Sequence, residues 1–562
     1  MLEVPYEERA IAQSNGARYF TGYGWVHVGP SLPEVLKRYV PAAYSWAEWV
    51  GQDLSGNPPQ GDPEPHPFTG EITLRTEQQE DVDMIRRARE EGAPEFILGN
   101  DVGTGKTAVA VAAAKSLPGI RNILVVCPLG VVPGWRSHLR RMGDGGKRWA
   151  IINYESSKKL LEAPAKAREA KRTRTKNLHI AREGKAKVQW DLVITDESHA
   201  RGNPESQQTM VLDRVIAGPG RTPAFVLNLS ATAGSNPAQL SYLHRGIAWR
   251  TGNPPRRTIT ADEYVHWCER NGVKVTRGGF GNRLTWDRNG ADLKKMHMLL
   301  FKGEPRWGVR RTPPWDEPQR IPLPVELTRP ERVTYEEEWA RFKDAMEHLE
   351  RIREKSASQN GNVGKALSEA SAQGRAAQVR YRQKAGQIKA RGTALFTKEL
   401  LAKGRQVAIS CEYIGTVEAV REALAASGIE AAEFTGQNRN ERESHRVAFQ
   451  RGEVSVIIFT PAEGFDLHAN DSGVQGASRV PRAIVVAEPR WSPKKALQVE
   501  GRCHRDHQLA PVYYSYAEDT VDEKVISASL AGMRDTKVLM GDSVAHFASL
   551  SQALGVPLVL SD

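Results

Sequence analysis

Short apolar runs alternate with longer helical stretches in two regions of the 562-residue chain. In the first region, from about 70 to 250, the runs lie at 96–98, 123–126, 150–153, 192–194 and 225–229. In the second region, from about 395 to 535, they lie at 407–409, 454–459, 484–486 and 512–516. Fully apolar runs of this length, separated by helices, indicate strands of parallel sheets that are covered on both faces. The pattern therefore predicts an α/β fold with two parallel-sheet lobes.

Other segments lack this alternation of apolar runs and helices, which indicates further domains or linkers. A chain of this length is also too long for one core. The expected division is a small N-terminal module at 1–69, a first lobe at 70–255, an inter-lobe insertion and helical linker at 256–394, a second lobe at 395–535 and a C-terminal tail at 536–562. The first lobe contains a strongly basic insertion at 156–188. The linker has the pattern of long polar helices, broken near Gln359.

A glycine-rich turn follows the first apolar run and precedes a helical stretch. Residues 99–107 read Gly-Asn-Asp-Val-Gly-Thr-Gly-Lys-Thr. In a phosphate-binding loop such glycines turn backbone N–H groups towards phosphate oxygens, and the helix N-terminus adds partial positive charge. Lys106 would reach the outer phosphates and Thr107 would bind Mg²⁺, whereas an ordinary glycine turn is the alternative because Asn100 replaces the usual first glycine. The nucleotide-binding candidates of this loop are Gly103, Thr104, Gly105, Lys106 and Thr107.

Two carboxylates follow the apolar run at 192–194. The segment reads Leu-Val-Ile-Thr-Asp-Glu-Ser-His, so Asp196 and Glu197 emerge where ligands of parallel sheets bind. Asp196 suits Mg²⁺, and Glu197 suits the water that attacks a γ-phosphate. An acidic strand-to-loop turn is the bland alternative, which the nearby glycine loop disfavours.

Two arginines spaced three apart stand out in the second lobe, in the segment 498–508. If this segment is helical, Arg502 and Arg505 lie on one face, where guanidinium groups suit the charge that develops on a transferring phosphate. The competing interpretation is a metal cluster of Cys503, His504 and His507. No fourth ligand is evident and adjacent Cys-His is poor chelate geometry, so we favour the arginine interpretation.

Composition limits the partners and the compartment. Lys and Arg exceed Asp and Glu by 78 to 67, for a net charge of +11, which favours a polyanionic partner. The four cysteines are far apart and no apolar run is long enough to span a bilayer. The first residues do not have the pattern of a signal peptide. We therefore expect a cytoplasmic protein without membrane contact, in a bacterial cell or a phage-infected host.

In their order, these segments resemble the motifs of a superfamily 2 helicase-like ATPase, and within that group the Swi/Snf type. Residues 74–78, Leu-Arg-Thr-Glu-Gln, resemble the adenine-recognising Q motif, and 125–135 and 151–155 resemble motifs Ia and Ib. Residues 196–199 are similar to a DEAH-like motif II, and 229–232, Leu-Ser-Ala-Thr, to motif III. The Arg-Arg segment at 309–312 and motifs IVa, V and VI at 435–449, 460–467 and 498–508 follow in family order. The resemblance covers roughly residues 70–535.

This resemblance implies two RecA-like lobes joined by a helical linker, with ATP and Mg²⁺ as cofactors. It implies that Gln78 contacts the adenine, that Gly464 and Asp466 of motif V bind nucleotide, and that Arg502 and Arg505 act on the γ-phosphate. Ser-Ala-Thr replaces the Gly-Thr-Pro that is usual in Swi/Snf-type proteins, and His507 replaces a glycine of motif VI. These departures leave the subfamily open.

The implied activity is DNA-dependent ATP hydrolysis by a motor that tracks the backbone of double-stranded or forked DNA. A strand-separating DNA or RNA helicase and the motor subunit of a restriction or defence complex are the alternatives. We expect a monomer and identify no protein partner. The basic insertion at 156–188 either extends the DNA track or forms a solvated helical hairpin. Pro128, Ser156, Ser157 and Thr460 are candidate backbone contacts.

Overall fold

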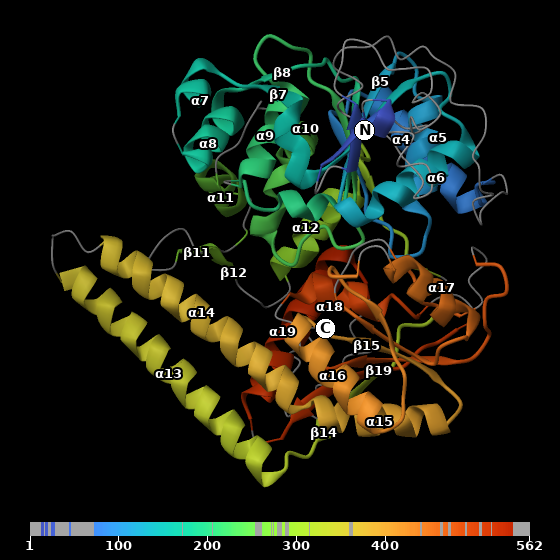
Figure 1. Ribbon diagram of the computed structural model, residues 1–562. Helices are drawn as coiled ribbons and strands as arrows, with labels where there is room; N and C mark the ends of the chain where they lie inside the picture. Colours follow the sequence, from blue (N-terminus) through green and yellow to red (C-terminus); the bar gives the residue numbers. More distant parts are fainter. Residues whose placement is uncertain are drawn as a thin grey trace. The chain divides into compact units, whose positions relative to one another are not determined.

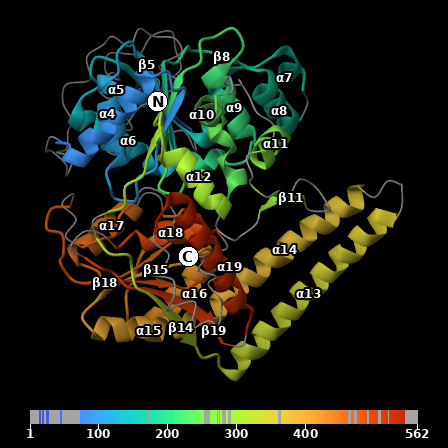
Figure 2. The same ribbon diagram turned by 180° about the vertical axis from the view of Figure 1, so that it is seen from behind.

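The computed structural model describes residues 13–15, 17–20, 24–27, 44–45 and 72–542, the last range with gaps at 171, 205, 253–260, 271–272, 274, 278–283, 287–290, 314, 359–363, 439–440, 461–464, 470–473, 489–491, 505–507 and 519. The chain divides into two compact units. The first unit comprises Met1–Pro313, Asp535–Ser543 and Ser561–Asp562, and the second comprises Pro314–Arg534 and Val544–Leu560. Each unit is built around its own sheet (Figures 1 and 2).

The first unit contains a seven-stranded sheet in which every pairing is parallel. In spatial order its strands are β13 (Gly308–Val309), β4 (Glu95–Leu98), β10 (Phe225–Leu229), β9 (Leu192–Asp196), β5 (Asn122–Cys127), β6 (Arg148–Asn153) and β3 (Tyr44–Ser45). Its described helices are α4 (Thr76–Glu90), α5 (Lys106–Ser116), α6 (Val132–Met142), α7 (Ala165–Glu169), α8 (Thr173–Glu183), α9 (Gln207–Ala217), α10 (His244–Arg250), α11 (Ala261–Arg270) and α12 (Ala291–Phe301). Two-stranded antiparallel sheets pair β1 (Ala17–Phe20) with β2 (Gly24–His27), β7 (Leu161–Glu162) with β8 (Lys185–Ala186), and β11 (Val275–Arg277) with β12 (Leu284–Trp286).

Both faces of this sheet are buried. Along β5, Val125 belongs to one apolar cluster, whereas its neighbours Leu124 and Val126 belong to another. Successive side chains of a strand point to opposite faces, so two clusters on one strand mean a covered sheet. This arrangement explains why the predicted strands are continuously apolar rather than alternating.

The second unit contains a six-stranded sheet, also parallel throughout. In spatial order its strands are β14 (Arg320–Val325), β19 (Val512–Ala517), β18 (Arg482–Val486), β15 (Gln406–Ser410), β17 (Val456–Phe459) and β16 (Ala432–Phe434). Its helices are α13 (Arg329–Ser358), α14 (Gly364–Ile388), α15 (Ala390–Ala402), α16 (Ile414–Ala426), α17 (Arg442–Arg451), α18 (Pro493–Glu500) and the first part of α19 (Val521–Met540). The predicted α/β class with two RecA-like parallel-sheet lobes is confirmed, and every predicted strand is found.

The helical linker is an antiparallel pair. Helices α13 and α14 run side by side (Figures 1 and 2), and the break predicted near Gln359 falls outside the described residues. Near their base, Tyr335, Trp339 and Phe342 of α13 pack against Tyr381 of α14. Both helices group with the second sheet, and the five-segment division proposed from the sequence stays a prediction.

The basic insertion is a folded layer of the first unit. Its helix α8 packs on α9, and Leu160, Leu161, Ala181 and Ala186 enter the apolar cluster beneath them. The basic side chains at 172, 174, 176 and 182 are exposed. One side of the insertion is therefore core and the other is a cationic surface.

Within the described residues, no helix is long and apolar enough to cross a bilayer. The four cysteines are buried thiols: Cys127, Cys268, Cys411 and Cys503.

Candidate nucleotide-binding site

Strand register brings three candidate segments to one edge of the first sheet. Leu229, at the end of β10, pairs with Leu98 at the end of β4 and with Asp196 at the end of β9. The glycine loop follows Leu98, the carboxylates begin at Asp196, and Ser-Ala-Thr follows Leu229. Because the strands are parallel, all three segments emerge from the same carboxyl edge, the usual ligand-binding side of such sheets.

The glycine loop wraps around the side chain of Lys106, the first residue of α5. Lys106 Nζ donates to the carbonyl oxygens of Asn100 (2.9 Å) and Asp101 (3.0 Å). Gly103 and Gly105 have φ angles of 80° and 81°, which a side chain would strain. The loop therefore has a conformation that requires glycine at these two positions, with the lysine held inside it.

Gln78, the predicted adenine contact, lies directly against this loop. Its Nε2 donates to the carbonyl of Thr104 (2.9 Å), and its Oε1 accepts from the backbone N–H of Arg75 (2.9 Å). A Cβ on Gly105 would meet the Gln78 amide at 2.3 Å. Gln78 thus ties the start of α4 to the loop, while its contact with adenine stays a prediction.

The departure at Asn100 has a structural reason. Its Oδ1 accepts from the backbone N–H of Arg311 (2.9 Å), and its Nδ2 donates to Asp81 (2.5 Å). Asp81 also accepts from Arg311 Nε (2.6 Å). The buried Asn100 side chain joins the loop to α4 and to the segment after β13, which a glycine at this position cannot do.

The carboxylate of Asp196 is held from two sides. Trp135 Nε1 of α6 donates to Oδ2 (2.8 Å), and the backbone N–H of Glu197 donates to Oδ1 (2.9 Å). Tyr154 donates to the Asp196 carbonyl (2.8 Å). Glu197 itself has a φ of 50°, and among the described residues it is the non-glycine residue with positive φ. Such strain in a non-glycine residue is typical of functional sites.

Glu197 connects to the Ser-Ala-Thr segment through His199. The Nδ1 atom of His199 lies 3.2 Å from Glu197 Oε2 and 3.0 Å from Ser230 Oγ. Ser230 Oγ also accepts from the backbone N–H of Thr232 (3.2 Å). His199 therefore contacts both the Glu197 carboxylate and the Ser-Ala-Thr segment after β10.

Burial and charge shift the pKa values of this cluster in opposite directions. Burial and the adjacent Glu197 raise the pKa of Asp196 to about 6, against the opposing hydrogen bond from Trp135 and the charge of Lys106. Burial lowers the pKa of Lys106, and the charges of Glu197, Asp101 and Asp196 oppose that shift. Two carboxylates beside one buried lysine leave excess negative charge, which a divalent cation would neutralise.

The predicted residues of the second unit are only partly described. Arg502 Nη1 donates to the carbonyl of Phe465 (2.6 Å), and its guanidinium lies over the Phe465 ring at 4.8 Å. The carbonyl of Asp466 accepts from Gln450 Nε2 (3.0 Å). Arg505 and Gly464 lie outside the described residues. Arg502 is thus nearly buried against motif V of its own unit, and the roles of all four residues stay predictions.

The competing metal interpretation conflicts with the hydrogen bonds of His504. Its Nδ1 accepts from the backbone N–H of Ala510 (3.3 Å), so Nε2 carries the proton that it donates to the carbonyl of Asp316. Both ring nitrogens are therefore engaged in structural bonds, and His504 has no lone pair left for a metal. His507, the third candidate ligand, lies outside the described residues.

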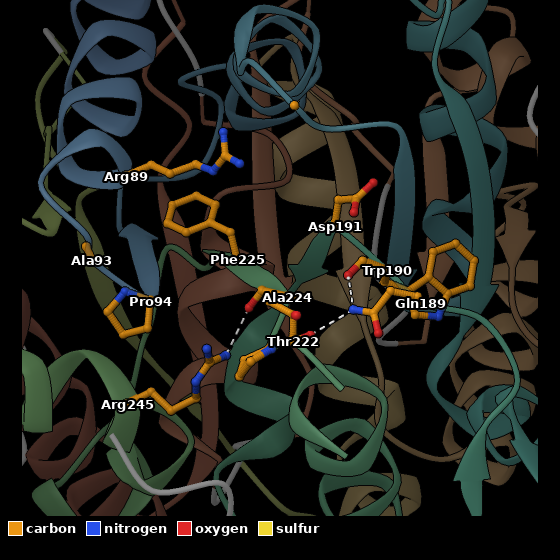
Figure 3. A pocket seen from close by; sticks show the side chains of 12 residues that line it. Arg89, Ala93, Pro94, Gln189, Trp190, Asp191, Thr222, Ala224, Phe225 and Arg245 are labelled. Atoms are coloured by element: carbon orange, nitrogen blue, oxygen red, sulfur yellow. Dashed lines mark hydrogen bonds between the residues drawn. The ribbon is translucent and has the colours of Figure 1, made fainter. Parts of the chain in front are cut away.

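A cavity of about 380 Å³ lies at the opposite, amino-terminal edge of the first sheet (Figure 3). Arg245 and Gln189 line it, but both donate to strand-end carbonyls, those of Ala224 (3.1 Å) and Thr222 (2.7 Å). None of the predicted site residues lines this cavity. The cavity is therefore separate from the candidate nucleotide site.

The sequence does not indicate the site contacts of two residues, Trp135 and Arg310. Arg310 donates to the carbonyl of Gly99 (2.6 Å) and to the carboxylate of Asp101 (2.9 Å), so it contacts the loop through two hydrogen bonds. Both residues lie in segments that resemble family motifs. The pattern marks such segments but does not show which atoms their side chains contact.

Comparison with known proteins completes this picture. No curated protein sequence matches the chain. The SWI2/SNF2 ATPase core of Sulfolobus solfataricus, solved in complex with double-stranded DNA, is 15% identical, with 85% of this chain and 99% of that chain covered and a TM-score of 0.31. The Hef helicase domain of Pyrococcus furiosus is 14% identical, with 80% and 97% covered and a TM-score of 0.39.

Residues 71–235 match the family described as "Type III restriction enzyme, res subunit". The matched region contains Gln78, the glycine loop, the Asp196-Glu197 pair and the Ser-Ala-Thr segment, which the structure brings to one sheet edge. This part of the chain is therefore similar to the ATPase domain of superfamily 2 helicase-like proteins.

Proposed function

We propose that the chain is an ATP-dependent DNA translocase that hydrolyses ATP between its two lobes while it tracks the DNA backbone, in replication, repair or recombination. The observation that carries this proposal is the shared sheet edge of Lys106, Asp196 and Glu197. A lysine in a glycine loop and two strand-end carboxylates are the groups that phosphoryl transfer to water requires.

Each residue has a distinct role in this proposal. Lys106 stabilises the outer phosphates, and Glu197 orients the water that attacks the γ-phosphorus as the bond to the β-phosphate oxygen breaks. Arg502 and Arg505 stabilise the charge that develops during transfer, an effect worth about 10³–10⁵ in rate for trans-acting arginines. Thr107 and Asp196 supply the oxygen donors that suit Mg²⁺, which would neutralise the charge of the phosphates.

DNA is the proposed polymer because the chain is basic, with a net charge of +11, and because its motifs resemble those of Swi/Snf-type translocases. Contacts to phosphates alone would allow movement along any sequence and would weaken steeply with salt. Of the two serines suggested as backbone contacts, Ser157 is buried, which leaves Ser156 as the accessible one.

The decisive experiment measures ATPase rates with single-stranded, double-stranded and forked DNA and with RNA. We expect duplex or forked DNA to raise turnover, and Lys106→Ala to abolish hydrolysis while DNA binding persists. Lys302→Ala, at an exposed lysine of the same unit, is the matched control and should hydrolyse ATP normally. A wild-type rate that no DNA ligand changes would contradict the proposal.

A second candidate is the motor subunit of a restriction complex, which the family match at 71–235 favours. Co-purification of a nuclease subunit with the tagged chain would support this function. A third candidate, a strand-separating helicase, is tested with a labelled partial duplex. Release of the short strand supports strand separation, whereas displacement of a bound protein without strand release supports translocation.

A further inference from the structure

The last turn of α19 belongs to the first unit, although the helix begins in the second. Leu539 and Met540 are buried in the apolar core of the first unit, and a Cβ on Gly99 would meet the Met540 side chain at 3.1 Å. The end of this helix, more than 400 residues after the glycine loop in the sequence, therefore packs against the start of that loop.

A glycine cap ends α19 and directs the next residue inward. Gly541 has a φ of 78°, its N–H donates to the Val538 carbonyl (3.1 Å), and the N–H of Asp542 donates to the Lys537 carbonyl (2.9 Å). These two bonds form a Schellman motif, which reverses the chain at a helix end. The reversal places Lys537 and Asp542 on the same side of the helix end.

Four charged side chains meet there in a neutral network. Arg310 donates to Asp542 with Nε (3.0 Å) and to Asp101 with Nη2 (2.9 Å). Lys537 Nζ lies 3.2 Å from Asp542 Oδ2 and 3.6 Å from Asp101 Oδ2. The side chains of Arg310, Lys537 and Asp542 are 6%, 8% and 2% exposed, so their charges depend on each other rather than on water.

Asp101 connects this network to the nucleotide site. Its side chain accepts from Arg310, while its backbone carbonyl accepts from Lys106 Nζ (3.0 Å) and from the Thr104 hydroxyl (2.7 Å). Its N–H donates to the Arg311 carbonyl (3.0 Å). The orientation of the Asp101 peptide, and with it the conformation of the loop around Lys106, is therefore fixed from the side of α19.

We propose that Lys537 and Asp542 are positioning residues for ATP: through Arg310 and Asp101, the end of α19 holds the phosphate loop in its binding conformation. This inference rests on the proposed ATPase function. It assigns a part in nucleotide binding to residues outside every segment that resembles a helicase motif.

The test uses full-length Asp542→Asn and Lys537→Met variants. Each leaves one uncompensated buried charge beside Asp101, so we expect the KM for ATP and the Kd of a fluorescent ATP analogue to rise about tenfold. Turnover at saturating ATP should change less. Lys537→Arg keeps the charge and should restore the wild-type KM, and Lys302→Met serves as the exposed-lysine control. The double variant removes one charge of each sign, so its KM should rise by less than the product of the two single effects.

The KM for ATP distinguishes a positioning role of Lys537 and Asp542 from a purely structural role. If both variants melt at a lower temperature and lose active fraction while the KM and Kd stay at wild-type values, the helix end is only structural and the inference is wrong. If Lys537→Arg is as impaired as Lys537→Met, charge is not what matters and the inference is also wrong. A wild-type protein that neither binds nor hydrolyses ATP would instead show that the proposed function has failed.

Discussion

At the scale of single residues, Glu197 is the side chain whose role can be tested most directly. Its φ of 50° marks a strained backbone, and its charge acts on the buried Lys106. Glu197→Gln keeps the size and the hydrogen-bonding capacity but removes the charge that orients water. We expect turnover to fall by about 10²-fold or more, with little change in the KM for ATP. Steady-state kinetics check this, and retained turnover would rule out the role proposed for Glu197.

The raised pKa of Asp196 predicts that both stability and kcat/KM depend on pH. Its pKa of about 6 lies above the usual 3.8, so the folded protein without ligand binds this proton more tightly and loses stability as pH rises from 3.8 to about 6. The proposed role of Asp196 as a Mg²⁺ ligand needs the ionised form, so we expect kcat/KM to fall as pH drops through about 6. Added Mg²⁺ should move this acidic limb of the pH profile to lower pH, because it competes with the proton.

Trp135→Phe should shift the acidic limb of the kcat/KM profile to higher pH. The indole N–H stabilises the ionised carboxylate, so its removal raises the pKa of Asp196 further. A hydrogen bond to a charged group is worth about 1.5–3 kcal/mol, which predicts an upward shift of at least about one pH unit. The pH profile of kcat/KM checks this; a limb that stays in place would mean that another group controls it.

At the scale of elements, the basic insertion offers a separable surface. Its apolar side is core, but Arg174, Lys176 and Arg182 on α8 are exposed. Replacement of all three by glutamine should leave the free energy of unfolding within about 0.5 kcal/mol per substitution, because the apolar side of the insertion stays intact. If α8 lines the DNA track, the slope of log Kd against log salt should become shallower by about 0.9 for each DNA phosphate that the variant no longer neutralises. An unchanged slope would identify a solvated surface.

Elements also show where sequence patterns suffice and where they fail. Fully apolar runs such as the one that forms β9 predict a buried parallel strand because no other short element places every side chain in the core. The sequence pattern does not predict the edge strand β14, because Pro322 and Pro324 argue against a strand. Prolines are nevertheless tolerated at the edge of a sheet, where β14 lies. The two-residue β13 has no periodicity to detect, yet it places Arg310 and Arg311 beside the loop.

The residues of the candidate site likewise differ in how far the sequence indicates their positions and contacts. The placement of Lys106, Asp196 and Glu197 at one sheet edge could be predicted because their positions after apolar runs are local features of the sequence, while their roles stay predictions. The contacts of Trp135, Arg310 and Asp542 were not, because each depends on long-range packing that no local spacing records. Asn100 is the intermediate case: the sequence showed the departure, and only the structure showed that its amide needs both a donor and an acceptor.

At the scale of the whole molecule, the two units have separate apolar cores, and the glycine loop with Lys106 belongs to the first. A non-hydrolysable ATP analogue without DNA should therefore stabilise the first unit selectively. At about 100 times its Kd a ligand contributes about 2.7 kcal/mol, or about 4 °C for a unit of this size. Hydrogen exchange with mass spectrometry should show slower exchange in β4 and α5, and unchanged exchange in β15 and β18. Lys106→Ala should abolish the protection. Equal protection of both sheets in the absence of DNA would show instead that nucleotide alone couples the units, and DNA would then not be needed to link ATP binding to a change in the second unit.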